Sequence, residues 1–205
     1  MSAFKNDDDF NKLMDNIRAT MEDAARVVMT CQPDRLVLGM SSETFWNGLE
    51  GSKRLIARME EVAGGAPVTT GADAVRAALT KYGNIRRIAV ITPYMPVGDA
   101  QVRRFFEDCG FEIVTLKGLQ CGSPVQIAHV SEKQLRNAII EVDDSAVEAI
   151  VQVGTNLAMA RLAGVAEFWI DKPVIAINTA IYWHALRQSG VTDRVPGFGS
   201  LLGEY

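Results

Sequence analysis

Apolar side chains recur along the chain in two periods, which predict helices and buried strands. Between residues 10 and 28 they fall three and four positions apart among charged residues, which predicts one long helix that ends before Gln32-Pro33. Short apolar runs predict strands at 36–40, 87–92, 111–117, 149–153 and 174–177, with a shorter extended piece at 67–69. Further helices are expected at 42–49, 52–63, 71–82, 99–109, 130–143, from 156 onward, and at 180–189. The glycine-rich tail, 196–205, is expected to be irregular. This alternation predicts an α/β fold with mainly parallel sheets flanked by helices.

Two segments place polar side chains directly after a buried strand. Residues 35–48 read RLVLGMSSETFWNG and residues 149–164 read AIVQVGTNLAMARLAG. In each, the strand is followed by hydroxyl or amide side chains, Ser41-Ser42 or Thr155-Asn156, and then by an amphipathic helix. Such side chains cap helix starts, where unpaired N–H groups and the helix dipole favour an anion. Two such turns indicate a small carboxylate held from two sides, although helix capping alone is the alternative.

The two halves of the chain repeat this order of elements. In both, the polar turn and its helix lead into a Pro-Val strand, at 67–68 and 173–174, and then into a helix that ends at glycine. One interpretation is that all βα units look alike. The other predicts two pseudo-symmetric lobes with the active site in the cleft between them, residues 1–85 with 180–205 forming the first lobe and 86–179 the second, as approximate boundaries.

Composition removes several classes of function. The 205 residues carry a net charge of −4, which disfavours a nucleic-acid partner. No apolar run is long enough to span a membrane, and the first ten residues lack a signal-peptide core. The three cysteines are odd in number and form no CxxC, which favours free thiols and a cytoplasmic location. The chain has two histidines and no cluster of metal-ligating side chains, so we expect no metal site. It contains no GxGxxG or P-loop motif, so we expect no nucleotide cofactor.

Several segments together carry a resemblance to a known family. They are GMSSETFWNG (39–48), ITPYMPVGDAQVRRFFEDCGFEIV (91–114), VGTNLAMARLAG (153–164), NTAIYWHALRQSG (178–190) and PGFGSLLGEY (196–205). In order and spacing the chain resembles the aspartate/glutamate racemase superfamily, in the branch of maleate cis-trans isomerase and arylmalonate decarboxylase. The resemblance implies two α/β lobes around a central site, no cofactor and a homodimer. It also implies a strand before the first long helix, so either the numbering begins downstream of it or the first lobe lacks that strand.

The cysteines of that family are missing at the matching positions. The resemblance implies a thiol in each lobe, and the two positions are Met40 and Gly154 here. Without both thiols, racemisation and a covalent thiol route are disfavoured, because each needs them as acid, base or nucleophile. Cys31 and Cys109 lie at predicted helix ends and are expected to be at least partly buried. Cys121 lies in the 118–124 loop, which in the family approaches the substrate, and it is a candidate catalytic residue.

The resemblance also implies a carboxylate cradle. The matching substrate-binding positions are Ser41, Ser42, Tyr94, Gly154, Thr155 and Asn156, and Ser41 and Tyr94 join Cys121 as candidate catalytic residues. Fixed donors are needed because loss of CO₂ or a proton beside a carboxylate concentrates negative charge on oxygen. For Glu43 a helix-dipole role is favoured over a general base, for His184 a structural role, and for His129 a surface position.

The hypothesis is therefore a cofactor-independent enzyme acting on a small mono- or dicarboxylate. Its reaction would be decarboxylase- or isomerase-like, passing through an enediolate-type intermediate, and not that of a two-cysteine racemase. Two alternatives remain, a carboxylate-binding homologue without catalysis and a hydrolase or hydratase that uses bound water. Phe45, Trp46, Met40 and Met159 lie near the turns, where they indicate either an apolar subsite or ordinary core.

Overall fold

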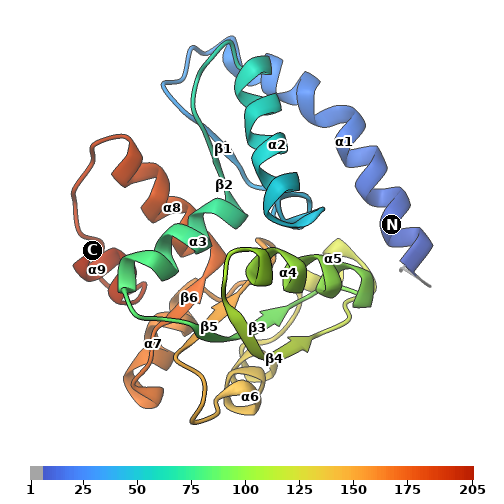
Figure 1. The fold of residues 1–205 in the computed structure, drawn as a ribbon. Coiled ribbons are helices and arrows are strands. Elements are labelled where there is room, and N and C mark those ends of the chain that lie inside the picture. The colour runs from blue at the N-terminus through green and yellow to red at the C-terminus, as the bar shows by residue number, and fades with distance from the viewer. Residues whose placement is uncertain (1–6) are drawn as a thin grey trace.

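The computed structural model describes residues 7–205, and it has two groups of strands among helices (Figure 1). The polar start of the chain lies partly in residues 1–6, outside this range. The elements are α1 (Asp7–Met29), β1 (Leu36–Leu38), η1 (Ser42–Phe45), α2 (Gly48–Val62), β2 (Val68–Thr70), α3 (Gly71–Tyr82), β3 (Arg87–Thr92), α4 (Pro96–Asp108), β4 (Glu112–Gly118), α5 (Pro124–Ala128), α6 (Glu132–Val142), β5 (Ala149–Gln152), α7 (Ala160–Ile170), β6 (Val174–Ala176), α8 (Ile177–Gln188) and α9 (Ser200–Glu204). None of these described helices is long and apolar enough to cross a membrane.

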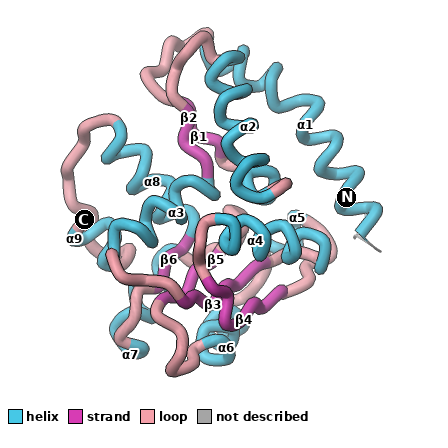
Figure 2. Tube along the Cα trace, viewed as in Figure 1, coloured by secondary structure: helices cyan, strands magenta, loops and turns pink. Residues whose placement is uncertain are grey.

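The strands form two parallel sheets. Four strands lie in the order β4-β3-β5-β6, while β1 and β2 pair with each other in a two-stranded sheet. Every described pair is parallel, for example Ile88 with Ala149 and Leu36 with Val68. Figure 2 shows the two groups of strands as separate magenta clusters with helices around them. The predicted α/β class with parallel sheets flanked by helices is confirmed.

Side chains of the central strand β3 point alternately into two different hydrophobic clusters. Successive side chains of a strand point to opposite faces. Accordingly Ile88 and Val90 belong to a cluster with the rings of α4, whereas Ala89 and Ile91 pack in a second cluster with α6 and α7. All four side chains are fully buried. Both faces of the larger sheet are thus covered, as an apolar parallel sheet requires.

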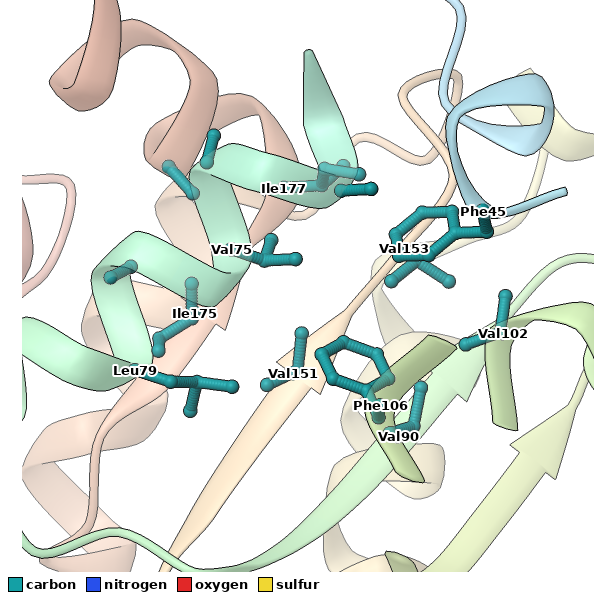
Figure 3. Close-up of a cluster of buried hydrophobic side chains, with 14 of the residues drawn as sticks. Phe45, Val75, Leu79, Val90, Val102, Phe106, Val151, Val153, Ile175 and Ile177 are labelled. Carbon is teal, nitrogen blue, oxygen red and sulfur yellow. The ribbon is translucent and has the colours of Figure 1, made fainter. Parts of the chain in front are cut away.

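The first of these clusters joins the larger sheet to η1 and α3, which follow the two strands of the smaller sheet. Figure 3 shows its side chains from η1, α3, α4 and the strands β3, β5 and β6 pointing toward one another. Phe45 of η1 makes an edge-to-face contact with Phe105 of α4, at 5.1 Å between ring centroids. Helices α2 and α4 also pack together, as do α3 and α8. The packing ties the residues after β1 to those after β3 and β5.

Several predicted helices begin at residues other than those expected. The helix expected from Ser42 to Leu49 is the short 3-10 turn η1, and α2 begins at Gly48. The break falls where Asn47 and Gly48 both have positive φ, at 61° and 66°. The helix expected from Asn156 begins only at Ala160, because residues 154–159 form tight turns with their own backbone bonds. α4 begins at Pro96, ahead of the expected Asp99, with proline in the first turn.

Two short helices were not predicted. In α5, Ser123 caps the first turn and Pro124 occupies its start, within and beyond the expected 118–124 loop. In α9, the glycine-rich tail is helical against expectation, and Leu201 and Leu202 are each 2% exposed. Burial of two leucines outweighs the poor helix propensity of the neighbouring glycines.

Candidate functional site

A cavity of about 430 Å³ lies where the two sheets meet. Its polar part comes from the residues that follow β1, β3 and β5, which is the edge where parallel α/β sheets bind ligands. Its apolar part comes from α1 and α5. The lining residues are Leu13, Met14, Ile17, Gly39, Met40, Ser41, Ser42, Tyr94, Pro124, Ile127, Gly154, Thr155 and Asn156. All six residues predicted to bind substrate line this one cavity, and so do two of the three candidate catalytic residues.

Hydroxyl groups connect the three strand ends at the base of the cavity. The Ser41 and Tyr94 hydroxyls lie 2.7 Å apart, within hydrogen-bond distance. The backbone N–H of Thr155 donates to Ser41 Oγ over 3.1 Å, and the Thr155 hydroxyl donates to the Gly39 carbonyl over 2.8 Å. Ser41 is 3% exposed and Tyr94 5%. The two polar turns therefore contact each other directly across the junction of the sheets.

The expectation that these side chains cap helices is wrong. Ser41 makes no side-chain cap bond to η1, and α7 begins several residues after Thr155 and Asn156 with no side-chain cap. The side-chain amide of Asn156 instead donates to the Pro124 carbonyl over 3.0 Å, and this bond holds α5 at the cavity. Because η1 is only four residues long and α7 starts late, helix dipoles contribute little here. The polar character of the site comes from hydroxyls and backbone amides.

Two backbone amides add to this set. Among the described residues, no acceptor is found for the N–H groups of Ser42 and Asn156. Both residues line the cavity. Unpaired N–H groups beside clustered hydroxyls favour a ligand that brings acceptor oxygens.

The electrostatics of the cavity depend on Tyr94. No charged side chain is among the described lining residues. Burial raises the pKa of Tyr94 above its ordinary value, the Ser41 hydrogen bond opposes this, and the nearby charge of Asp99 adds to it. Tyr94 therefore remains a neutral phenol at physiological pH, with a proton to donate.

The two positions matched to the family thiols differ in their surroundings. Met40 lines the cavity, and its sulfur accepts from the Ser42 hydroxyl over 3.2 Å. Gly154 has φ +94°, and a Cβ added there would lie 2.4 Å from Pro93 Cγ. The backbone at this turn thus excludes any side chain in its present conformation.

Cys121 is not brought to the cavity. It packs in the second hydrophobic cluster, its amide donates to the Pro93 carbonyl, and burial raises its pKa. A buried thiol with a raised pKa is a poor nucleophile, so the structure gives Cys121 no catalytic setting. Cys109 is partly buried, as expected, whereas the expectation of a buried Cys31 is wrong because that residue is exposed.

The remaining titratable candidates lie outside the cavity lining. Glu43 is 8% exposed and accepts from Arg18 Nε over 2.6 Å, so it ties α1 to η1. His184 is buried with Nε2 3.8 Å from Asp73 Oδ2, and His129 is exposed with Nδ1 bonded to the Val125 carbonyl. In the part of the chain that is described, no group of three or more His, Cys, Asp or Glu side chains could hold a metal ion.

The sequence reasoning missed the apolar wall. Leu13, Met14 and Ile17 of α1 and Pro124 and Ile127 of α5 line the cavity, and none was a candidate. The helical period in residues 10–28 identified an apolar face on α1 but not the surface that this face covers. The α5 wall was hidden because the loop was expected to be irregular.

Comparison with known proteins agrees with this architecture. The sequence model of the arylmalonate decarboxylase family matches residues 6–202. The maleate isomerase of Pseudomonas putida is 29% identical over 143 residues, which are 68% of this chain and 56% of that protein. That of Geobacillus stearothermophilus is 25% identical over 155 residues, 74% of this chain and 61% of the relative. The chain thus aligns with little more than half the length of such relatives.

Solved structures share the fold at low sequence identity. The Nocardia farcinica maleate cis-trans isomerase with a covalently bound succinylcysteine intermediate has a TM-score of 0.90 at 23% identity, covering 100% of this chain and 83% of that one. Arylmalonate decarboxylase has a TM-score of 0.81 at 23% identity, over 92% and 83%. With the family match over nearly its whole length, the chain belongs to the arylmalonate decarboxylase family.

Proposed function

We propose that the chain is a cofactor-independent enzyme acting on a small mono- or dicarboxylate. The reaction is decarboxylase- or isomerase-like, with an enediolate-type intermediate held in the cavity. The family contains decarboxylases and isomerases, which supports this class of reaction. The maleate isomerase of Pseudomonas putida S16 has been solved with maleate, which supports a small carboxylate as the ligand.

One observation carries the proposal. The Ser41 and Tyr94 hydroxyls and the Thr155 amide meet at one point of the cavity, although they come from three different strand ends. Donors fixed in advance around one point stabilise an oxyanion without reorganisation during the reaction. Removal of one such donor typically lowers kcat by about 10²–10³-fold.

Each group has a defined part in this scheme. Tyr94, held neutral by burial, donates its phenolic proton toward the carboxylate or enediolate oxygen. Ser41 accepts from Thr155 and pairs with Tyr94, so a developing oxyanion takes over these donors. The apolar residues of α1 and α5 exclude water, which strengthens the remaining electrostatic contacts.

Proton delivery in this chain depends on oxygen rather than sulfur. Neither position matched to a family thiol is a cysteine, and Gly154 leaves no room for a side chain. Within the proposal, Tyr94 and Ser41 are the proton-carrying groups closest to the bound oxygen. A hydroxyl pair of this kind is a weak acid, so slow turnover on activated substrates such as arylmalonates is expected.

The test is a substrate panel with a matched tyrosine pair. Phenylmalonate, methylmalonate, maleate and maleamate are incubated with the wild type, Tyr94→Phe and Tyr182→Phe, and products are followed by NMR. Tyr182 is 55% exposed on α8 and serves as the control. Turnover is expected to fall by about 10²-fold in Tyr94→Phe and to persist in Tyr182→Phe. Unchanged turnover in Tyr94→Phe would overturn the assigned role.

A carboxylate-binding protein without catalysis is the second candidate. The closed backbone at Gly154 favours it, because this turn offers no side chain for acid–base chemistry. Calorimetric binding of a panel member without any turnover would establish this alternative. Absence of both binding and turnover over the whole panel would exclude both candidates.

A further inference from the structure

We propose that Asp99 is a positioning residue for Tyr94, and that it acts through the hydroxyl of Thr92. This inference rests on the proposed function, since it explains how the Tyr94 hydroxyl is held as a donor in the cavity. Asp99 itself does not line the cavity, so it acts on Tyr94 and does not touch the ligand.

A relay of two hydrogen bonds connects Asp99 to the tyrosine. The Thr92 hydroxyl donates its proton to Asp99 Oδ1, so the lone pairs of Thr92 Oγ1 remain free to accept a second hydrogen bond. The backbone N–H of Tyr94 donates to that same Thr92 oxygen over 3.1 Å. Thr92 is fully buried, so each of its bonds lies in a low-dielectric setting where hydrogen bonds are strong. The carboxylate thus fixes the hydroxyl rotamer of Thr92, and Thr92 fixes the backbone at Tyr94.

Close packing against the first turn of α4 also fixes the phenol ring of Tyr94. A Cβ added at Gly98 would lie 2.8 Å from Tyr94 Cβ and 3.1 Å from its Cγ, so the first turn of α4 lies flat against the tyrosine. On the other side, a Cβ added at Gly118 would overlap Asp99 Oδ2. Both glycines are needed for this contact, one for the ring and one for the carboxylate. With its backbone and ring confined, Tyr94 places its hydroxyl 2.7 Å from Ser41 Oγ.

The charge of Asp99 reaches Tyr94 as well. Burial raises the pKa of Asp99 to about 6, although its bond to Thr92 and the charge of Arg103 oppose the shift. Ionised Asp99 in turn raises the pKa of Tyr94. The charged side chain that acts on Asp99 is Arg103 of the same helix, whereas Lys117 of β4 is paired with Glu141 of α6. Near pH 6 the environment of the phenol therefore changes with the protonation of Asp99.

The first test observes Tyr94 directly and needs no activity. The protein is labelled with ¹³C at tyrosine Cζ, and the Tyr94 signal among the four tyrosines is assigned by its loss in Tyr94→Phe. In the wild type this signal is expected to shift with a midpoint near pH 6. In Asp99→Asn the shift should disappear, because the amide keeps an acceptor for Thr92 but does not titrate. Asp108→Asn, on the same helix and bonded to the Leu49 amide, should leave the shift in place.

The second test measures positioning through ligand binding. Phenylacetate is the probe, and its affinity is measured by calorimetry at about pH 7.5, where carboxylates of ordinary pKa are ionised. Asp99→Ala and Thr92→Val break the relay and are expected to weaken binding by about tenfold, the size of one hydrogen bond to an anion. Asp99→Asn retains the relay and should bind within about twofold of the wild type.

The possible outcomes separate this inference from the proposed function. A Tyr94 signal that does not move near pH 6, or that still moves in Asp99→Asn, would overturn the inference. Equal probe affinity in Thr92→Val and the wild type would overturn it as well. If no variant and no wild type binds phenylacetate, the proposed function loses support, while the NMR titration still decides whether Asp99 acts on Tyr94.

Discussion

Single residues determine which chemistry the cavity supports. Ser41, Ser42, Thr155 and Asn156 follow strand ends, and this position in the sequence predicted that they would meet, whereas Tyr94 was implied only by the family resemblance. The part proposed for Asp99 could not be predicted, because this residue lies five positions after Tyr94 and only the folded loop places the Thr92 hydroxyl between them. The exclusion of Cys121 likewise depends on packing that no local pattern records.

Gly154 is expected to tolerate no side chain. Gly154→Ala and Gly154→Cys place a Cβ against Pro93 and force an L residue to φ +94°. The backbone strain and the overlap together are expected to lower the free energy of unfolding by about 2–5 kcal/mol. Denaturant unfolding monitored by circular dichroism measures this loss. Gly203→Ala is the control, since its added Cβ meets nothing within 4 Å.

Asp99 gives the stability of the protein a defined pH dependence. Its pKa is about 6 in the folded state against an ordinary 3.8, so the folded state binds the proton more tightly. The stabilising contribution of this proton is present at low pH and is lost as the pH rises through about 6. Asp99→Asn should therefore be more stable than the wild type by about 1–2 kcal/mol at neutral pH, after allowance for partial exposure. Denaturant titrations across the range should show this difference vanish toward pH 4; a constant difference would contradict it.

Among the secondary-structure elements, the long periodic ones were predicted correctly and the short ones were not. The strands of the larger sheet and the long helices α1, α3 and α6 were expected close to their observed ranges, because their apolar patterns are strong. The expectation that the strand at 36–40 is buried is wrong, because it ends at Leu38 and Val37 is 50% exposed. The elements η1, α5 and α9 have five residues or fewer, too few for a period to show. What stabilises them is tertiary burial, as for the leucines of α9.

The attachment of α1 is the clearest case, and Figure 1 shows this helix at the outer edge of the molecule beside α2. Arg18→Ala removes the partner of Glu43, whose side chain is 8% exposed, and leaves a buried carboxylate without its ion pair. A loss of about 2–4 kcal/mol in the free energy of unfolding is expected at neutral pH. Urea denaturation measures this loss, with Arg26→Ala as the control. The ion pairs of Arg26 lie on the surface of the same helix and should contribute no more than about 0.5 kcal/mol. Equal effects from the two substitutions would count against the tie.

For the molecule as a whole, the shared core predicts that both sheets unfold together. The cluster in Figure 3 contains Phe45 of η1 and Val75 of α3, which follow β1 and β2, together with Val151 of β5, so elements attached to both sheets share one cluster. A cluster shared by elements of both sheets favours one cooperative unfolding step. The site is part of the same body, because its polar residues follow strands of both sheets.

Two core truncations test this coupling. Phe45→Ala and Leu135→Ala each remove a fully buried side chain, and each should cost about 3–5 kcal/mol. Tryptophan fluorescence and circular dichroism should report one coincident transition in both variants. Only Phe45→Ala should also weaken phenylacetate binding, because Phe45 lies in η1 next to Ser41 and Ser42, whereas Leu135 packs on the far side of the larger sheet. Two separate transitions would contradict the coupling between the two sheets.

The bond from the Thr155 amide to Ser41 Oγ has a consequence for selectivity. The serine oxygen occupies the place that a ligand oxygen would take at this amide, so the Thr155 amide already has an acceptor within the protein. A ligand with a single acceptor oxygen replaces Ser41 Oγ as the partner of the Thr155 amide, so the number of hydrogen bonds stays the same and binding gains little free energy. A guest with two oxygens on one carbon engages the released amide and the phenol together. Discrimination by the number of oxygens is thereby built into the resting state.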